Sequence, residues 1–150
     1  MIFSAVRKMS KENDNIFNMF DYESFHPDDD ITFDEAVTNI GNGMDADSGV
    51  FTAPVSGIYT FSFAAKVTTM PPALATIQVL KGGKVEFYFG EFNHRQPILD
   101  FEGIIHSWMM SLVQNEEVHL KMDEKSERFL VNPENKNFIW FNGQLLYPSE

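Results

Sequence analysis

The sequence predicts an all-β sandwich or jelly roll, and three observations carry this expectation. Apolar residues alternate with polar ones in short runs, which is the period of a strand with one buried face. Turn residues interrupt these runs about every dozen positions, and no run keeps the 3.6-residue period of an amphipathic helix. Aromatic residues, which favour strands, make up 14% of the chain.

The first half of the chain carries the clearest alternation. Residues 1–8 predict a short strand, and residues 9–30 predict a long polar loop. Period-two spacing resumes at Ile31, and Phe51 opens a further strand after a turn at residues 45–49. The most regular amphipathic strand follows, with its apolar side chains at Tyr59, Phe61, Phe63, Ala65 and Val67.

The second half predicts a hairpin and then longer strands. Ile77 and Val79 lead to Gly82-Gly83, a dipeptide suited to a hairpin turn, and residues 85–89 form the return arm. Further strands are expected at residues 104–112, 118–122, 129–131 and 138–147.

Size, charge and cysteine content exclude several classes of protein. A length of 150 residues predicts one domain that spans residues 1–150. The net charge of −11 repels phosphate groups, so nucleic acid and anionic membranes are poor partners. No apolar run approaches the roughly 20 residues of a membrane span, which excludes membrane insertion by a helix. The absence of Cys removes disulfides, thiolate metal sites and cysteine nucleophiles.

A set of aromatic and glycine residues is specific enough to suggest a family. Phe33, Asn39, Phe51 and Gly57 are followed by alternating Tyr59, Phe61 and Phe63, and the chain closes with Phe141, Gly143, Leu145 and Tyr147. This set resembles the signature of the C1q domain, the globular head of complement first-component subunits, adiponectin-like hormones and cerebellins. These residues are expected to hold the fold rather than to form an active site.

The resemblance implies a fold, an assembly and a function. The expected fold is a ten-stranded jelly roll shared with tumour necrosis factor ligands, and the expected assembly is a homotrimer. The implied function is a non-enzymatic, extracellular recognition head that binds a protein, a glycan or a microbial surface in innate immunity, with no required cofactor. The alternative is a tumour-necrosis-factor-like or adipokine-like ligand for a cell-surface receptor.

The N-terminal sequence is relevant to the expected location. It lacks the pattern of a signal peptide, because charged residues interrupt residues 1–14, so extracellular residence is expected from the resemblance alone. The chain carries no Gly-X-Y repeat, so any collagen stalk would lie outside it.

Calcium is the one ion that the resemblance suggests as a ligand. Some C1q-like heads bind calcium through acidic loop side chains, and Asp100 and Glu102 fall near the corresponding loop. The alternative for these two carboxylates is an ordinary solvated loop.

A cupin-like metalloenzyme is a remote alternative. Such a site needs several histidines brought together, whereas His94, His106 and His119 are single residues about a dozen positions apart. Separate structural or surface histidines are the competing interpretation.

The aromatic excess also predicts contacts between subunits, because one core cannot easily cover so many rings. The candidates for such contacts are Tyr88, Phe92, Met109 and Phe138, and the alternative for each of them is the core of the subunit.

Overall fold

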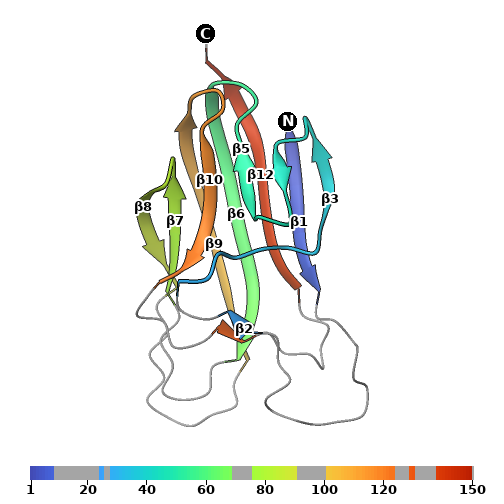
Figure 1. The fold of residues 1–150 in the computed structure, drawn as a ribbon, viewed down its shortest axis with the longest axis vertical. Coiled ribbons are helices and arrows are strands. Elements are labelled where there is room, and N and C mark those ends of the chain that lie inside the picture. The colour runs from blue at the N-terminus through green and yellow to red at the C-terminus, as the bar shows by residue number, and fades with distance from the viewer. Residues whose placement is uncertain are drawn as a thin grey trace.

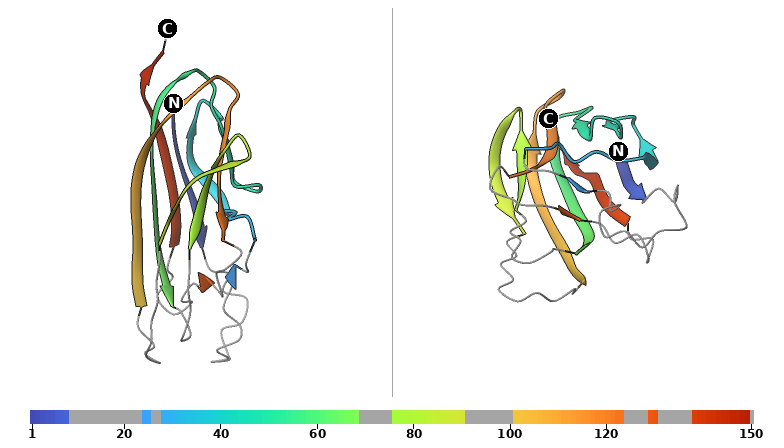
Figure 2. Two further views of the ribbon diagram at one scale, coloured as in Figure 1. Left: turned by 90° about the vertical axis from the view of Figure 1, so that its left-hand side faces the viewer. Right: turned by 60° about the horizontal axis from the view of Figure 1, so that its bottom comes forward.

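Two antiparallel sheets packed face to face make up the fold in the computed structural model (Figure 1). The structure describes residues 1–8, 24–25, 28–68, 76–90, 101–123, 129–130 and 138–149. No helix among these residues is long and apolar enough to cross a membrane. The edge-on view in Figure 2 shows the sheets as two layers, and Figure 1 places both chain termini at the same end.

Five long strands and two short ones form the larger sheet. Its long strands lie in the order β9–β6–β12–β1–β3, and all neighbours are antiparallel. The short strands β11 and β2 continue the sheet beside the last residue of β6. The bounds are β1 Ile2–Lys8, β2 Ser24–Phe25, β3 Glu35–Ile40, β6 Gly57–Thr68, β9 Phe101–Leu112, β11 Phe129–Leu130 and β12 Phe138–Pro148.

The smaller sheet has the order β4–β5–β10–β7–β8. Its bounds are β4 Met44–Asp45, β5 Val50–Thr52, β7 Ile77–Lys81, β8 Lys84–Phe89 and β10 Glu117–Met122. The all-β jelly-roll class is thereby confirmed. The described residues form twelve strands, whereas the resemblance implied ten, and β2, β4 and β11 are pairings of only two residues each.

The predicted hairpin joins β7 to β8. Gly82 and Gly83 both have positive φ angles, of 59° and 82°, as a two-residue turn of this hand requires. The sequence Lys81-Gly82-Gly83-Lys84 is therefore a turn between paired strands.

Alternation along the strands produces the core. Four residues of β6 and three of β10 are buried: Tyr59, Phe61, Phe63, Ala65, Val118, Leu120 and Met122. Rings from both sheets meet between the layers, where Phe3 of the larger sheet stacks on Phe51 of the smaller sheet at 4.9 Å. Within the larger sheet, Phe61 of β6 stacks on Phe141 of β12 at 5.8 Å. Each buried ring removes a large apolar area from water, so this aromatic cluster supplies much of the hydrophobic stabilisation.

Candidate functional site

The aromatic residues of the predicted motif lie together in the core. Phe33, Phe51, Phe61, Phe63 and Phe141 are all buried, and Tyr59 is buried beside them. The hydroxyl of Tyr59 donates a hydrogen bond to the carbonyl of Val55 at 2.6 Å. Burial raises the pKa of Tyr59, and the hydrogen bond to Val55 opposes that shift only partly.

The polar and glycine residues of the motif fix the backbone around these rings. Asn39 donates from Nδ2 to the carbonyl of Met44 at 2.8 Å and accepts from the backbone N–H of Met44 at 3.1 Å. It thereby joins β3 to β4. At Gly57 a β-carbon would collide with the backbone of Tyr147, and at Gly143 it would collide with the ring of Phe3.

The end of the motif departs from this buried pattern. Leu145 is partly buried against the core, but Tyr147 is 70% exposed. The pairing of β12 with β6 shifts register between Leu145 and Tyr147. Such a bulge adds one residue, so Tyr147 contributes its backbone to the sheet and leaves its ring on the surface.

The outward face of the larger sheet is the candidate binding surface. Side chains of adjacent strands lie opposite one another and form rows across the sheet. One row is made only of small hydroxyl and amide side chains, and we call it the polar row: Thr38 on β3, Ser4 on β1, Asn142 on β12, Ser62 on β6 and Ser107 on β9.

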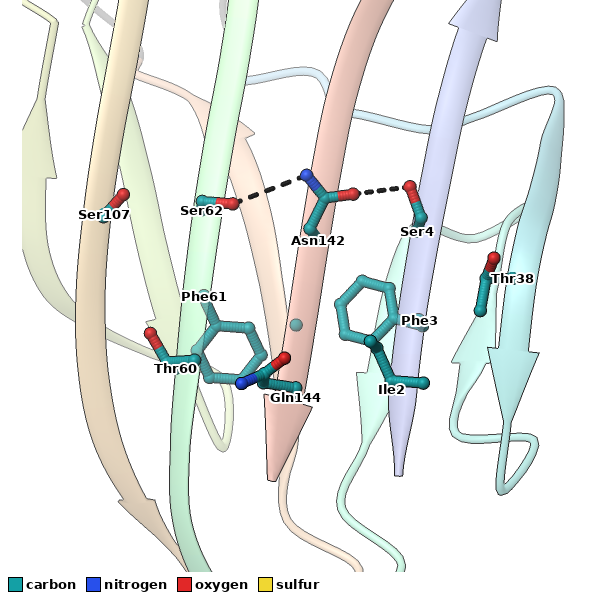
Figure 3. Close-up of a pocket in the computed structure, with 11 residues that line it drawn as sticks. Ile2, Phe3, Ser4, Thr38, Thr60, Phe61, Ser62, Ser107, Asn142 and Gln144 are labelled. Carbon is teal, nitrogen blue, oxygen red and sulfur yellow. Dashed lines mark hydrogen bonds between the residues drawn. The ribbon is translucent and has the colours of Figure 1, made fainter. Parts of the chain in front are cut away.

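Hydrogen bonds join the centre of the polar row (Figure 3). The hydroxyl of Ser4 donates to Oδ1 of Asn142 at 2.5 Å. Nδ2 of Asn142 donates to the hydroxyl of Ser62 at 3.4 Å. Asn142 is thus held in one orientation at the middle of the face.

Two rows flank the polar row. On one side lies an apolar row of Val6, Trp140, Ala64 and Ile105, with Glu35 at its end. On the other side lies a mixed row of Ile40, Ile2, Gln144, Thr60 and Met109. Glu35 is the only charged side chain in the three rows, although the chain has a net charge of −11.

A shallow depression opens on this face, and Gly143 is one of the residues that line it. It has a volume of about 230 Å³. Its lining joins the polar row to Gln144, Thr60 and Ile2, and the rings of Phe3 and Phe61 lie behind it (Figure 3). Neighbouring hydroxyl, amide and apolar groups suit contact with another uncharged surface.

Large apolar side chains are exposed along the edges of the same face. Ile105 is 79% exposed and Met109 is 68% exposed on β9, and Ile40 is 63% exposed on β3. Of the residues predicted for contacts between subunits, Met109 and Tyr88 both lie on the surface rather than in the core. Phe92 lies outside the described residues, as does the side chain of Phe138.

The histidines of the described residues are not gathered into one site. His106 stacks on Phe89 with a centroid separation of 4.7 Å and also stacks on Trp108. His119 lies in the other sheet, where its Nε2 is 3.6 Å from Oδ1 of Asp30. His94 lies outside the described residues.

No group of three or more metal-ligating side chains occurs in the part of the chain that the structure describes. Asp100 lies outside that part, and Glu102 lies in β9 with its side chain undescribed. The calcium expectation for this pair therefore stays a prediction.

Sequence reasoning missed the polar row. Its signal was present as polar residues alternating with aromatic ones in β6 and β12. Only the register between five strands, which no local pattern specifies, shows that these positions form a line.

Comparison with solved structures shows that the fold is a jelly roll of the kind found in complement and tumour necrosis factor proteins. The globular domain of zebrafish complement 1qA protein has a TM-score of 0.70 and 16% identity, covering 99% of this chain and 98% of that one. Eiger TNF from S. frugiperda has a TM-score of 0.61 and 11% identity, covering 99% and 95%. Murine APRIL at pH 5.0 has a TM-score of 0.59 and 13% identity, covering 95% and 98%.

The family follows from the sequence match. The model of the C1q domain matches residues 3–146, which is nearly the whole chain. This chain belongs to the C1q domain family, as its aromatic and glycine motif indicated. The likeness in fold extends to tumour necrosis factor ligands.

Proposed function

We propose that this protein is a non-enzymatic recognition head that assembles as a homotrimer and binds an extracellular protein, glycan or microbial surface. The observation that carries the proposal is the set of three rows on the outward face of the larger sheet, in which Glu35 is the only charged residue and Ile40, Ile105 and Met109 are exposed. Exposed apolar surface of this kind is typical of protein contacts. A contact between unlike surfaces of identical copies closes into a ring when the rotation allows it.

The charge of the chain favours this face for assembly. Copies that each carry −11 repel one another, most strongly where carboxylates approach closely. At physiological salt the screening length is about 8 Å, so only carboxylates near the contact oppose assembly. The three rows of the outward face, which carry one charged residue, allow close approach at small electrostatic cost.

The chemistry of the depression on the outward face favours recognition over catalysis. The depression on the outward face offers hydroxyls, amides and aliphatic side chains without an ionisable group. General acid–base and nucleophilic catalysis need a titratable or activated group beside the substrate. Turnover assays with and without divalent metals test this part of the proposal, and metal-dependent turnover would contradict it.

A signalling ligand for a cell-surface receptor is the second candidate. The likeness in fold to both a complement domain and tumour necrosis factor ligands supports this second function as an alternative. The two functions differ in ligand, because a recognition head binds repeated surface groups, whereas a signalling ligand binds one receptor.

Pull-down with the intact assembly separates these candidates. The purified protein would be presented to a panel of microbial polysaccharides and, in parallel, to host cell-surface extracts. Saturable binding to the panel supports the recognition head. Capture of one cell-surface receptor with no binding to the panel would replace it with the signalling ligand.

Exchange of the connecting segments tests where the ligand binds. Specificity commonly resides in loops carried by a rigid scaffold, so residues 9–30, 92–102 and 123–137 are the segments to exchange. Loss of binding with the assembly unchanged is expected. Full binding after exchange of all three segments would move the ligand site to the sheets.

Calcium binding by Asp100 and Glu102 is a separate part of the proposal. Calcium prefers several carboxylate and carbonyl oxygens, and it would lower repulsion between acidic copies. We expect a higher melting temperature of the assembly in calcium than in chelator at equal ionic strength, and we expect Asp100→Asn with Glu102→Gln to abolish the difference. Equal melting temperatures in calcium and chelator would remove the ion.

A further inference from the structure

We propose that the polar row (Thr38, Ser4, Asn142, Ser62 and Ser107) is buried between copies of this chain and makes assembly selective for copies that carry the same row. The inference rests on the proposed trimer and names the occupant of the outward face, a second copy of this chain. Three observations support it: the charge of the face, the register of the rows, and the spare hydrogen-bonding capacity of Asn142.

Charge favours a second copy as the occupant. The polar row and the mixed row together contain no ionisable side chain. Elsewhere on the described surface, carboxylates occur at Asp28, Asp45, Asp47, Glu86 and Glu117, among others. A second copy with the same net charge of −11 therefore meets no opposing carboxylate within these two rows.

Symmetry brings equal rows together. Strands β6, β9 and β12 run along the long axis of the molecule (Figure 1). The proposed trimer has its axis parallel to these strands, and rotation about such an axis keeps each residue at one height along it. The polar row of each copy then meets the polar row of its neighbour, with the apolar and mixed rows packing above and below it.

The chemistry of Asn142 explains the selectivity. A primary amide has two donor hydrogens and an oxygen with two lone pairs. The bonds to Ser4 and Ser62 engage one donor and one lone pair. The remaining donor and lone pair need partners once water is excluded, and a matching row supplies them. A chain with apolar residues at this height would leave them buried and unpaired, which disfavours the mixed assembly.

A buried polar position that sets partner choice has a physical precedent. A single Asn in the seam of a coiled coil fixes register and oligomeric state at some cost in stability. The five-residue polar row would act in the same way across a sheet interface. Its removal is therefore expected to relax partner choice while assembly itself persists.

The first experiment measures exchange between two differently labelled forms. One is the wild-type chain, and the other carries Ser4→Ala, Asn142→Leu and Ser62→Ala. Each form is expected to form trimers alone, and native mass spectrometry of the equilibrated mixture should show mixed trimers at least about tenfold below the statistical proportion. Mixed trimers in statistical proportion would overturn the proposed selectivity.

The second experiment decides the burial of the row even if the triple variant does not fold. Asn142→Asp keeps the shape of the side chain, and the hydroxyls of Ser4 and Ser62 can both donate to its carboxylate. Three such carboxylates buried at one height should weaken assembly at least tenfold at pH 7.5. Asn115→Asp adds the same charge on an exposed turn and should assemble like the wild type.

The outcomes separate this inference from the proposed function. If the wild type and Asn142→Asp form equally stable trimers, the row is not buried between copies, and the inference fails while the trimer stands. If the wild type is a monomer at micromolar concentration, the proposed trimer fails and the inference fails with it. Circular dichroism of each variant confirms that the fold is retained.

Discussion

Gly143 shows how one residue links the core to the outward face. Its missing side chain leaves room for the rings of Phe3 and Phe61 in the core, and the depression opens in front of it. An added β-carbon would collide with Phe3 and would lie 2.9 Å from Cδ1 of Phe61. The glycine is required here by close packing rather than by a positive φ angle.

Gly143→Ala is expected to lower the free energy of unfolding by about 1–3 kcal/mol, the usual cost of overpacking a core. Phe3→Leu opens space at the same contact. The double variant should therefore be more stable than the sum of the single effects predicts, because the two residues are in direct contact. Chemical denaturation of the four proteins measures this coupling, and additive effects would contradict the packing described here.

Tyr59 gives a stability change with pH. Burial raises its pKa above the ordinary value of 10.0, so the folded state holds the phenolic proton more tightly than the unfolded state. This contribution is fully present below pH 10 and is lost as the pH rises through the folded-state pKa. The wild type should lose more stability than Tyr59→Phe between pH 8 and pH 11 in urea denaturation, and parallel losses would contradict it.

Removal of the Tyr59 hydroxyl also tests its hydrogen bond. The bond to the carbonyl of Val55 closes the turn before β6. Tyr59→Phe is expected to cost about 1 kcal/mol at pH 7, the net value of a typical hydrogen bond. An unchanged midpoint of urea denaturation at pH 7 would show that water replaces the bond without cost.

At the scale of elements, the β7–β8 hairpin depends on a turn with two positive φ angles. Gly82→Asn should be tolerated, since Asn is a favoured first residue in this turn. Gly82→Val should cost about 1–2 kcal/mol, because a branched side chain disfavours the left-handed region. The two variants form a matched pair for thermal unfolding, and equal melting temperatures would contradict the turn assignment.

Local alternation predicted the strands but not how they pair. The aromatic spacing in β6 and the apolar spacing in β10 were sufficient to place both strands with their buried faces. The bulge before Tyr147 reversed the face expected from simple alternation, because one extra residue shifts every later side chain. Two-residue strands such as β4 are too short to carry a period at all.

The candidate site was less predictable than the fold, because its residues come together only through the pairing of strands that are distant in the sequence. The sequence offered Met109 and Tyr88 as candidates for contacts between subunits, with the core as the alternative, because the chain has more rings than one core can cover; the structure places both on the surface. It could not indicate the polar row, because Ser4, Ser62 and Asn142 are far apart in the sequence and ordinary in type. Their meaning depends on long-range register, which arises from the packing of the whole sandwich.

At the scale of the whole molecule, charge and assembly are coupled. Each copy brings a net charge of −11, so assembly at a face with few charges should strengthen as salt screens the remaining repulsion. We expect trimer dissociation measured by dilution to be weaker in 0.5 M than in 0.05 M sodium chloride. The opposite trend would indicate that charge pairs hold the copies together.

The mass of the protein in solution tests the central claim most directly. Sedimentation equilibrium at micromolar concentration should give three times the 17.2 kDa of one chain. A mass of 17.2 kDa over the same concentration range would contradict the account, because the outward face would then remain exposed to water.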